Sequence, residues 1–425
     1  MLLHDFQEDQ LLKRIVAISF ILVCTSVAWF ILGGTVYSRT NESGEKGKPG
    51  VLSVWGAPQE QRPPTASFDR IDRHMVQTEV DGKKIVRTEE WTTNVPLSLE
   101  SSRINVSLAL SHRQKGLLWY STYVVGFDGL YTFRNKTPQP QLVKFALPFP
   151  AEQAIYDGLV MQVNGKALPT TSDKRTAFVT ATVQPDDAVS LSVAYHSQGL
   201  DSWRYKLGDD VTQARDFQLV MKTDFRDIDF PMNTLSPTRK RETSNGWELV
   251  WRYRNLISGF QIAMAMPEKL QPGPLAGEIS YFAPVSLLLF FFLMFTITTL
   301  RNIELHPMNY FFLAAAFFAF HLLLAYLVDH ISIHLAFALS SVVSVFLVVS
   351  YLRLVIGLRF ALVEAGGAQF IYLVLFSYAF FLKGFTGLAV TLGCIVTLFV
   401  VMQMTARINW RQQFVRGLGS SAPSA

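Results

Sequence analysis

Six long stretches of the chain contain almost only apolar residues, and most polar residues lie outside them. These stretches are 15–36, 281–300, 308–328, 331–352, about 365–382 and 384–405. A helix rises about 1.5 Å per residue, so about 20 apolar residues cross a hydrocarbon core about 30 Å thick. The pattern therefore predicts six transmembrane helices, and the fifth has the shortest purely apolar run.

The first apolar stretch is longer than the core of a signal peptide. No cleavage site of the small-x-small kind follows it. We therefore expect 15–36 to be an uncleaved anchor helix, preceded by a short N-terminal segment, 1–14.

Between the first and second apolar stretches, short runs alternate apolar and polar residues. The period of two and the β-branched and aromatic residues are typical of strands. The runs are 103–110, 117–125, 177–183, 188–196, 217–223, 247–254 and 260–266. Asn-Gly pairs at 164–165 and 245–246 predict tight turns with positive φ. We expect a large, mainly antiparallel, sandwich-like β domain over 37–280, entered through a Gly- and Pro-rich linker at 38–68.

Charge sets the expected orientation of the six spans. Only 17% of the residues are charged, below the roughly 25% of ordinary soluble domains. Alternating sides from the first span places nearly all basic flanking residues on one face, which is the cytoplasmic face by the positive-inside rule. They are Lys13, Arg14, Arg301, Arg353, Arg359, Arg407, Arg411 and Arg416, with Lys383 opposite. We expect both termini, including a basic tail at 406–425, in the cytoplasm, a five-helix bundle at 281–405, and 37–280 on the outer side.

The net charge of +5 comes mostly from the membrane part of the chain. The basic excess therefore reflects topology, and we expect the lipid bilayer and no nucleic acid as a partner. Cys24 and Cys394 both lie in predicted spans, so the outer domain has no disulfide to support its fold.

The outer domain offers little that suggests catalysis. Its histidines, His74, His112 and His196, are isolated in sequence, with no Cys/His cluster at metal spacing and no Gly-x-Ser-x-Gly motif. We expect no catalytic residue, no cofactor and no metal, so the chain is predicted not to be an enzyme.

The stretch "ELHPMNY" at 304–310 separates the second and third spans. Pro307 lacks an amide hydrogen and suits the first position of a helix, while His306 before it is pushed out of helical geometry. We therefore interpret the stretch as a tight bend, with Met308 starting the third span. Contact of Glu304 or His306 with a partner is the less favoured alternative.

Two further polar places lie in or beside the spans. His321 is inside the third span and is expected to bond across to Ser340, Ser341 or Ser344 of the fourth. Asp329, His330 and His334 surround the next turn, where polar residues are ordinary at a water interface. A transport or proton-relay role for His321 and a metal site at Asp329, His330 and His334 are the functional alternatives.

Several motifs resemble the CreD family of bacterial inner membrane proteins. They are "LHPMNYFFL" at 305–313, "LLLAYLVDHISIHLAF" at 322–337, "WGAPQ" at 55–59, the segment 230–256 and "TARINW" at 405–410. The resemblance implies a periplasmic outer domain and a role in cell-envelope integrity and colicin tolerance under the CreB/CreC two-component system. It assigns no catalytic residue. His306, Pro307, Met308, Asp329 and His330 occupy matching motif positions, and with His321 we expect them to be structural or interaction residues.

Two hypotheses of function follow. The preferred one is a non-enzymatic envelope protein whose β domain binds a periplasmic or membrane protein partner. The alternative is a transporter or lipid-handling protein that uses His321, Asp329 and His330 in the bundle. The absence of Gly/Pro-broken spans and inverted repeats weighs against transport.

Overall fold

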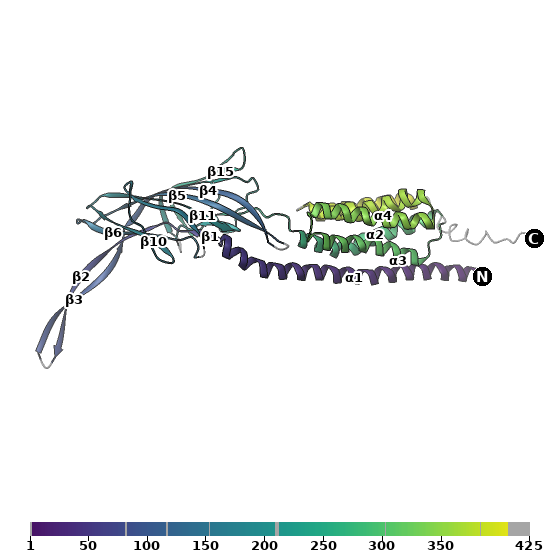
Figure 1. Ribbon diagram of the computed structural model, residues 1–425, viewed down its shortest axis with the longest axis horizontal. Helices are drawn as coiled ribbons and strands as arrows, with labels where there is room; N and C mark the ends of the chain where they lie inside the picture. The colour runs from purple at the N-terminus through teal and green to yellow at the C-terminus, as the bar shows by residue number, and fades with distance from the viewer. Residues whose placement is uncertain are drawn as a thin grey trace, which may run out of the picture. The chain divides into compact units, whose positions relative to one another are not determined.

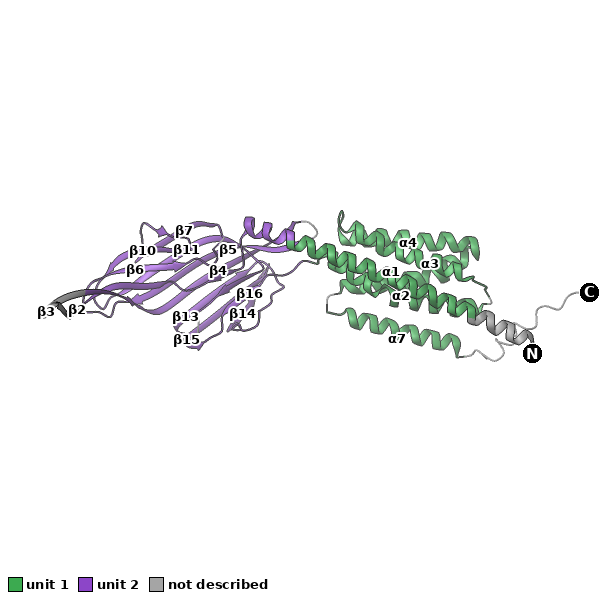
Figure 2. Cartoon of the chain, turned by 90° about the horizontal axis from the view of Figure 1, so that it is seen from below, with its two compact units in different colours: residues 1–45, 270–425 green, residues 46–269 purple. Residues whose placement is uncertain are grey.

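The computed structural model describes residues 2–80, 83–115, 118–152, 154–208, 212–301, 303–382 and 384–406. They form two compact units, 1–45 with 270–425 and 46–269, which Figure 2 colours separately. The second unit lies within the segment 37–280 that the sequence predicts to be the outer domain. Each unit is described by itself below.

Six helices in the described residues are long and apolar enough to cross a membrane, as predicted. The regular ones are α1 (Leu2–Trp55), α2 (Pro272–Leu300), α3 (Pro307–Leu327), α4 (Ile333–Val355) and α7 (Thr386–Thr405). The remaining span, Phe360–Phe381, is irregular. It consists of η1 (Phe360–Gly366), α5 (Gly367–Gln369), η2 (Phe370–Leu375), α6 (Phe376–Tyr378) and η3 (Ala379–Phe381), of which η1 and η2 are π-helical.

Aromatic rings fill the centre of the membrane unit. Phe290 of α2 packs on Phe317 of α3 with ring centroids 4.7 Å apart, and Phe291 meets Tyr310 edge to face at 5.2 Å. All four rings are buried. Offset and edge-to-face contacts of this kind add to the packing between helices where lipid provides no hydrophobic drive.

Helix α1 continues far beyond the apolar stretch 15–36, through residues where the sequence predicts a linker. That prediction is wrong for 38–55, although Pro49 lies inside the helix. Packing overrides the weak helix propensity. In the 46–269 unit, Val51 is buried with Tyr120 and Leu200, and a Cβ on Gly47 would lie 2.7 Å from the Tyr120 hydroxyl.

Three sheets make up the β unit, and all but two strand pairs are antiparallel, as predicted. A three-stranded sheet has the order β1 (Gln59–Gln61), β12 (Ser202–Tyr205), β16 (Ile262–Ala265). A five-stranded sheet has the order β3 (Lys83–Pro96), β2 (Thr65–Val80), β6 (Gln141–Pro148), β10 (Thr176–Val183), β9 (Thr171–Ser172). An eight-stranded sheet has the order β14 (Arg239–Glu242), β15 (Trp247–Ser258), β13 (Thr212–Thr223), β4 (Ser98–Lys115), β5 (Leu118–Arg134), β11 (Ala188–Leu200), β7 (Tyr156–Val163), β8 (Lys166–Ala167).

One core joins the five- and eight-stranded sheets. Phe145 of β6 meets Phe133 of β5 edge to face at 5.8 Å, and both rings are buried. Strands β2 and β3 leave this sandwich as a two-stranded arm (Figure 1), because β2 pairs with β6 only through 65–67. The sandwich presents the other face of its large sheet to solvent, and that face carries the candidate site.

The two Asn-Gly pairs behave differently. Asn164 and Gly165 have φ of 50° and 76° and form the predicted tight turn between β7 and β8. The pair at 245–246 lies in the turn between the antiparallel strands β14 and β15, as predicted, but the positive φ predicted for it is wrong. Gly246 is required there for space, since a Cβ would lie 2.1 Å from the backbone oxygen of Thr223.

Candidate functional site

The residues predicted from the membrane half lie at four separate places. His306 is the N-cap of α3, with extended backbone (φ −67°, ψ 146°), and Pro307 is the first helical residue, as predicted. The His306 imidazole accepts a hydrogen bond from the Met308 amide through Nδ1 at 3.2 Å. This bond satisfies one of the free amides at the start of the helix. His306 therefore has a structural role within the bend, as the N-cap of α3.

Asp329 lies at the end of α3 and pairs with a residue that the sequence did not single out. Arg39 of α1 places Nη1 3.0 Å from Asp329 Oδ2, and its Nη2 donates to the Ala325 carbonyl oxygen at 2.6 Å. His330 is exposed, and His334 packs on the Phe381 ring at 5.3 Å. In the described part of the chain, no three His, Cys, Asp or Glu side chains come together as metal ligands.

His321 is fully buried, but its predicted bond to the serines of α4 is wrong. Its Nδ1 lies 2.9 Å from the Phe317 carbonyl oxygen of the same helix, and its ring meets Trp29 of α1 edge to face. Within the described residues, its Nε2 has no hydrogen-bond partner, and neither has the Ser340 hydroxyl. The carbonyl one turn back is the nearest acceptor to a helical histidine, which explains why the interhelical bond is not made.

A polar link between three spans passes through Gln369, which the sequence analysis did not consider. Ser344 of α4 donates to the Ala316 carbonyl oxygen of α3 at 2.6 Å and accepts from Gln369 Nε2 at 2.8 Å. Gln369 lies between the two π-helical turns of the fifth span. Nearer the start of the same span, Glu364 of η1 pairs with Arg301 at the end of α2. That pair explains why this span begins at Phe360, earlier than its apolar run suggests.

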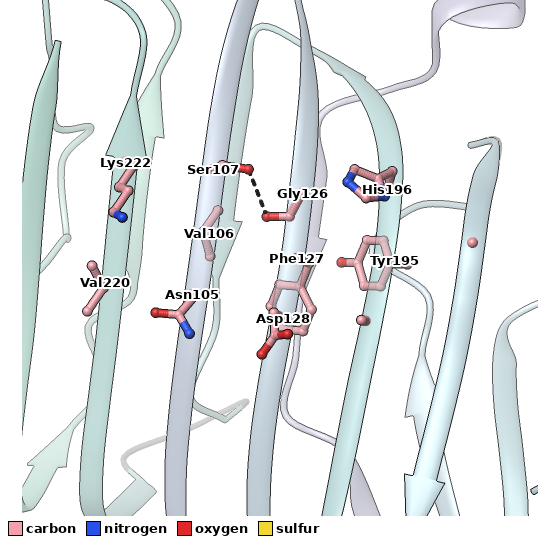
Figure 3. A pocket seen from close by; sticks show the side chains of 12 residues that line it. Asn105, Val106, Ser107, Gly126, Phe127, Asp128, Tyr195, His196, Val220 and Lys222 are labelled. Atoms are coloured by element: carbon pink, nitrogen blue, oxygen red, sulfur yellow. Dashed lines mark hydrogen bonds between the residues drawn. The ribbon is translucent and has the colours of Figure 1, made fainter. Parts of the chain in front are cut away.

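A hollow lies on the solvent face of the eight-stranded sheet (Figure 3). It has a volume of about 380 Å³ and is lined from β13, β4, β5, β11 and β7. Strand pairing aligns Lys222, Ser107, Gly126 and His196 in one row across four strands. Asn105 and Asp128 lie in the next row. The sheet register therefore collects polar side chains from distant parts of the sequence.

Two glycines shape this hollow. A Cβ on Gly126 would lie 2.6 Å from Ser107 Oγ and 3.5 Å from the His196 ring, so the absence of a side chain lets the Ser107 hydroxyl and the His196 ring come together above this residue. Gly158 has φ of 64° and lies where the β7–β11 register shifts between Ala194 and His196. This is a β-bulge with a left-handed glycine, a feature that re-aims neighbouring side chains and is frequent beside binding sites.

Two aromatic rings from the lining strands lie in the core, on the side of the sheet away from the hollow. Phe127 and Tyr195 are 2% exposed, stack at 5.0 Å and turn into the core. The Tyr195 hydroxyl donates to Gln61 Oε1 at 2.6 Å, and burial raises its pKa well above the usual range. These rings support the sheet and present no face to the hollow.

Four polar side chains of the hollow are unpaired, unlike the Ser107 hydroxyl beside them and the charged residues nearby. Elsewhere on this sheet Arg103 pairs with Asp216 at 2.6 Å and Arg134 with Glu100 at 3.0 Å. In contrast, no side-chain hydrogen bond or ion pair joins four lining residues to any part of the described chain. They are Asn105, Asp128, His196 and Lys222. The hollow thus holds an ammonium, a carboxylate, an imidazole and an amide that are available to a ligand.

Only His196 of this site was noticed in the sequence, as an isolated histidine. The strands were predictable, but their order was not, and the row from Lys222 to His196 depends on the parallel pairing of β13 with β4. The sequence offered one signal for this site, which is a glycine such as Gly126 inside a strand. Such a glycine often marks a place where a ligand or another backbone approaches the strand closely.

Comparison with known proteins supports the resemblance in the membrane half. The family described as Inner membrane protein CreD matches residues 279–411, which confirms the resemblance over less than half of the chain. None of the curated proteins matches the chain.

Solved structures share only a distant likeness. A candidate nutrient-binding protein of Legionella pneumophila is 12% identical, with a TM-score of 0.33, over 55% of this chain and 76% of that one. An M1 zinc metallopeptidase from Deinococcus radiodurans is 8% identical, with a TM-score of 0.27, over 77% of this chain and 95% of that one. At such scores neither likeness bears on fold or function here.

Proposed function

Starting from a multi-pass inner membrane protein of the CreD type, we propose that the chain is a non-enzymatic envelope protein whose β unit binds a partner on the periplasmic side. The helix bundle anchors this binding unit. Loss of the protein would weaken envelope integrity and colicin tolerance. The observation that carries the proposal is the set of unpaired polar side chains around the hollow of the eight-stranded sheet. Unpaired groups that converge on one cavity are the usual mark of a ligand site.

The arrangement of the hollow favours binding over nucleophilic catalysis. Ser107 and His196 lie on β4 and β11, with Gly126 of β5 between them. Across Gly126, no hydrogen bond joins the Ser107 hydroxyl to the His196 ring in the described chain. A nucleophile and its base need to lie within hydrogen-bond distance of each other. The Ser107 hydroxyl instead faces the Gly126 carbonyl oxygen at 3.5 Å.

The test is site-specific photo-crosslinking in the native membrane. A photoreactive residue at Asn105, in the hollow, is compared with one at Thr180, which is exposed on β10 of the other sheet. We expect a discrete crosslinked product from position 105 and none from position 180. Adding Lys222→Glu should reduce the product and weaken rescue of a deletion strain under envelope stress.

Two outcomes would refute this proposal. One is equal crosslinking from positions 105 and 180, which would mean that the hollow has no preferred partner. The other is full rescue by a double variant, Asp128→Ala with Lys222→Ala, which removes both charges of the hollow.

A second function, transport or lipid handling through the bundle, is favoured by one observation. His321 Nε2, Ser340 Oγ and Gln369 Oε1 are buried in the membrane unit without a partner in the described chain. Such groups are costly in lipid and often mark a path or a proton relay. If His321→Leu and Ser340→Ala leave the protein folded and the deletion strain fully rescued, this second function fails.

A further inference from the structure

The charges of the hollow are arranged for a ligand with two opposite charges. Lys222 on β13 and Asp128 on β5 are both exposed, and both line the cavity. They do not pair with each other, because β4 lies between their strands. A ligand with a single anionic group would satisfy Lys222 and leave Asp128 unpaired nearby, where it would repel that group. A zwitterion satisfies both.

The separation of these charges sets the length of the ligand. Lys222 is level with Gly126, and Asp128 is two residues further along β5. Two strand spacings across and two residues along give about 12 Å between the Cα atoms. A free amino acid is too short to reach both, whereas a peptide spans about 3.5 Å per residue. Three extended residues, at about 3.5 Å each, together with the lengths of the Lys222 and Asp128 side chains, are enough to bridge the two Cα positions.

The residues between the charges suit a peptide backbone. Asn105 and Ser107 of β4 lie between Lys222 and Asp128, and Asn105 offers both an amide donor and an amide acceptor. His196 closes the opposite side (Figure 3). Bulky side chains on the ligand are not required by any lining group.

A neutral saccharide fits less well. Sugar rings are commonly held on exposed aromatic faces, but the two rings that line this cavity, Phe127 and Tyr195, are buried beneath the sheet. A neutral ligand would also leave the two charges of the hollow without partners.

We infer that the hollow binds a short peptide with free termini, with its terminal carboxylate at Lys222 and its terminal ammonium at Asp128. This inference rests on the proposed function, since it names the ligand of the same site. It places three to four residues across strands β13, β4 and β5, with the peptide backbone bonded to Asn105.

The experiment is calorimetric titration of the full-length protein, purified in detergent, with trialanine. Alanine and dialanine serve as shorter probes, and trialanine blocked by acetylation or by amidation serves as the charge control. We expect trialanine to bind at least about tenfold more tightly than alanine or either blocked form, because each block removes one charge-assisted contact.

Variants then assign each terminus. In Lys222→Gln, trialanine should bind about tenfold more weakly, and amidation should have no further effect. In Asp128→Asn, trialanine should also bind more weakly, and acetylation of its terminal ammonium should not weaken binding further. Lys166→Gln is the matched control, since Lys166 is exposed on β8 of the same sheet and does not line the hollow. It should bind like the unaltered protein.

Equal binding of all probes, or a response to amidation that persists in Lys222→Gln, would overturn the peptide assignment. This failure is separable from failure of the proposed function. If crosslinks from position 105 persist while trialanine does not bind, the site stands and its ligand is of another class. A side chain at position 126 would displace the Ser107 hydroxyl and the His196 ring. If Gly126→Val removes neither the crosslinks nor trialanine binding, the hollow is not the binding site.

Discussion

Asp201 of the β unit has a carboxyl whose pKa lies above its ordinary value, although it is paired with Lys48. It has a left-handed φ of 63° between β11 and β12. Burial raises its pKa above the ordinary value of 3.8, Lys48 at 4.0 Å lowers it, and Glu268 raises it. Because the folded state holds the proton more tightly than the unfolded chain, this carboxyl favours folding at low pH only. Its contribution is lost as the pH rises through the folded pKa.

We therefore expect Asp201→Asn to raise the stability of the β unit at neutral pH. The gain should shrink as the pH falls toward about 4, where the unfolded carboxyl also becomes protonated. Unfolding of the full-length protein across this pH range measures the difference. Asp186→Asn is the control, because Asp186 is also left-handed (φ 54°) and reports the effect of the residue change on such a backbone. A gain that is independent of pH, or shared by Asp186→Asn, would contradict this explanation.

Individual residues could be predicted from the sequence only where their local neighbours decide their role. Pro307 and His306 were predictable, because proline fixes its own backbone and restricts the residue before it. Lys222 and Asp128 were not, because the parallel pairing of β13 with β4 brings together segments more than 100 residues apart. The unpartnered buried atoms of His321 and Ser340 were equally invisible.

At the scale of elements, the turn between α2 and α3 depends on one imidazole cap. His306→Ala removes the acceptor for the Met308 amide and should cost about 1 kcal/mol of stability. His306→Asn should restore most of it, since asparagine is a strong N-cap. Glu304→Ala is the control, because Glu304 is exposed beside the turn. Thermal unfolding in detergent measures all three, and an equal loss in Glu304→Ala would show that the cap is unimportant.

The packing of α1 on α3 provides a second prediction at this scale. Arg39 contacts the Asp329 carboxylate, the Ala325 carbonyl oxygen and the Tyr326 ring. A double-mutant cycle of Arg39→Ala and Asp329→Ala should give a coupling of roughly 1 kcal/mol, since the pair is partly buried and forked. Arg39→Lys should lose part of it, because ammonium cannot bond both oxygens as a fork does.

The control for this cycle is His330→Ala, which alters the exposed neighbour of Asp329. It should leave thermal stability nearly unchanged. A coupling near zero would mean that Arg39 and Asp329 act independently, with the charges already satisfied by water.

Elements were predictable where one period runs through them and failed where packing decides. The six spans and seven strand segments followed from hydrophobicity and alternation, whereas β2, β3, β6 and β7 were not predicted. The extension of α1 to Trp55 did not, because Gly47, Pro49 and Gly50 are poor helix residues, and the two glycines lie close to Lys115 of β4 and Tyr120 of β5. The π-helical turns around Gln369 had no sequence signal that a propensity scale records.

For the whole molecule, the side of the membrane on which the β unit lies decides which partners it meets. Basic residues between the spans predict that 46–269 is periplasmic, since their translocation is unfavourable. A chain that carries one new cysteine, with Cys24 and Cys394 replaced by alanine, tests this. Lys174 is exposed in the β unit and Glu304 is exposed in the α2–α3 turn, so Lys174→Cys and Glu304→Cys report opposite sides.

An impermeant maleimide applied to intact spheroplasts should modify Lys174→Cys and spare Glu304→Cys until the membrane is opened. The reason is the distribution of charge: α2 and α3 form a hairpin whose connection follows Arg301, and an arginine beside a short turn holds that turn in the cytoplasm. The reverse labelling would place the hollow of the eight-stranded sheet in the cytoplasm. A peptide site there would face cytosolic ligands, and the envelope role would lose its physical basis even if trialanine bound as expected.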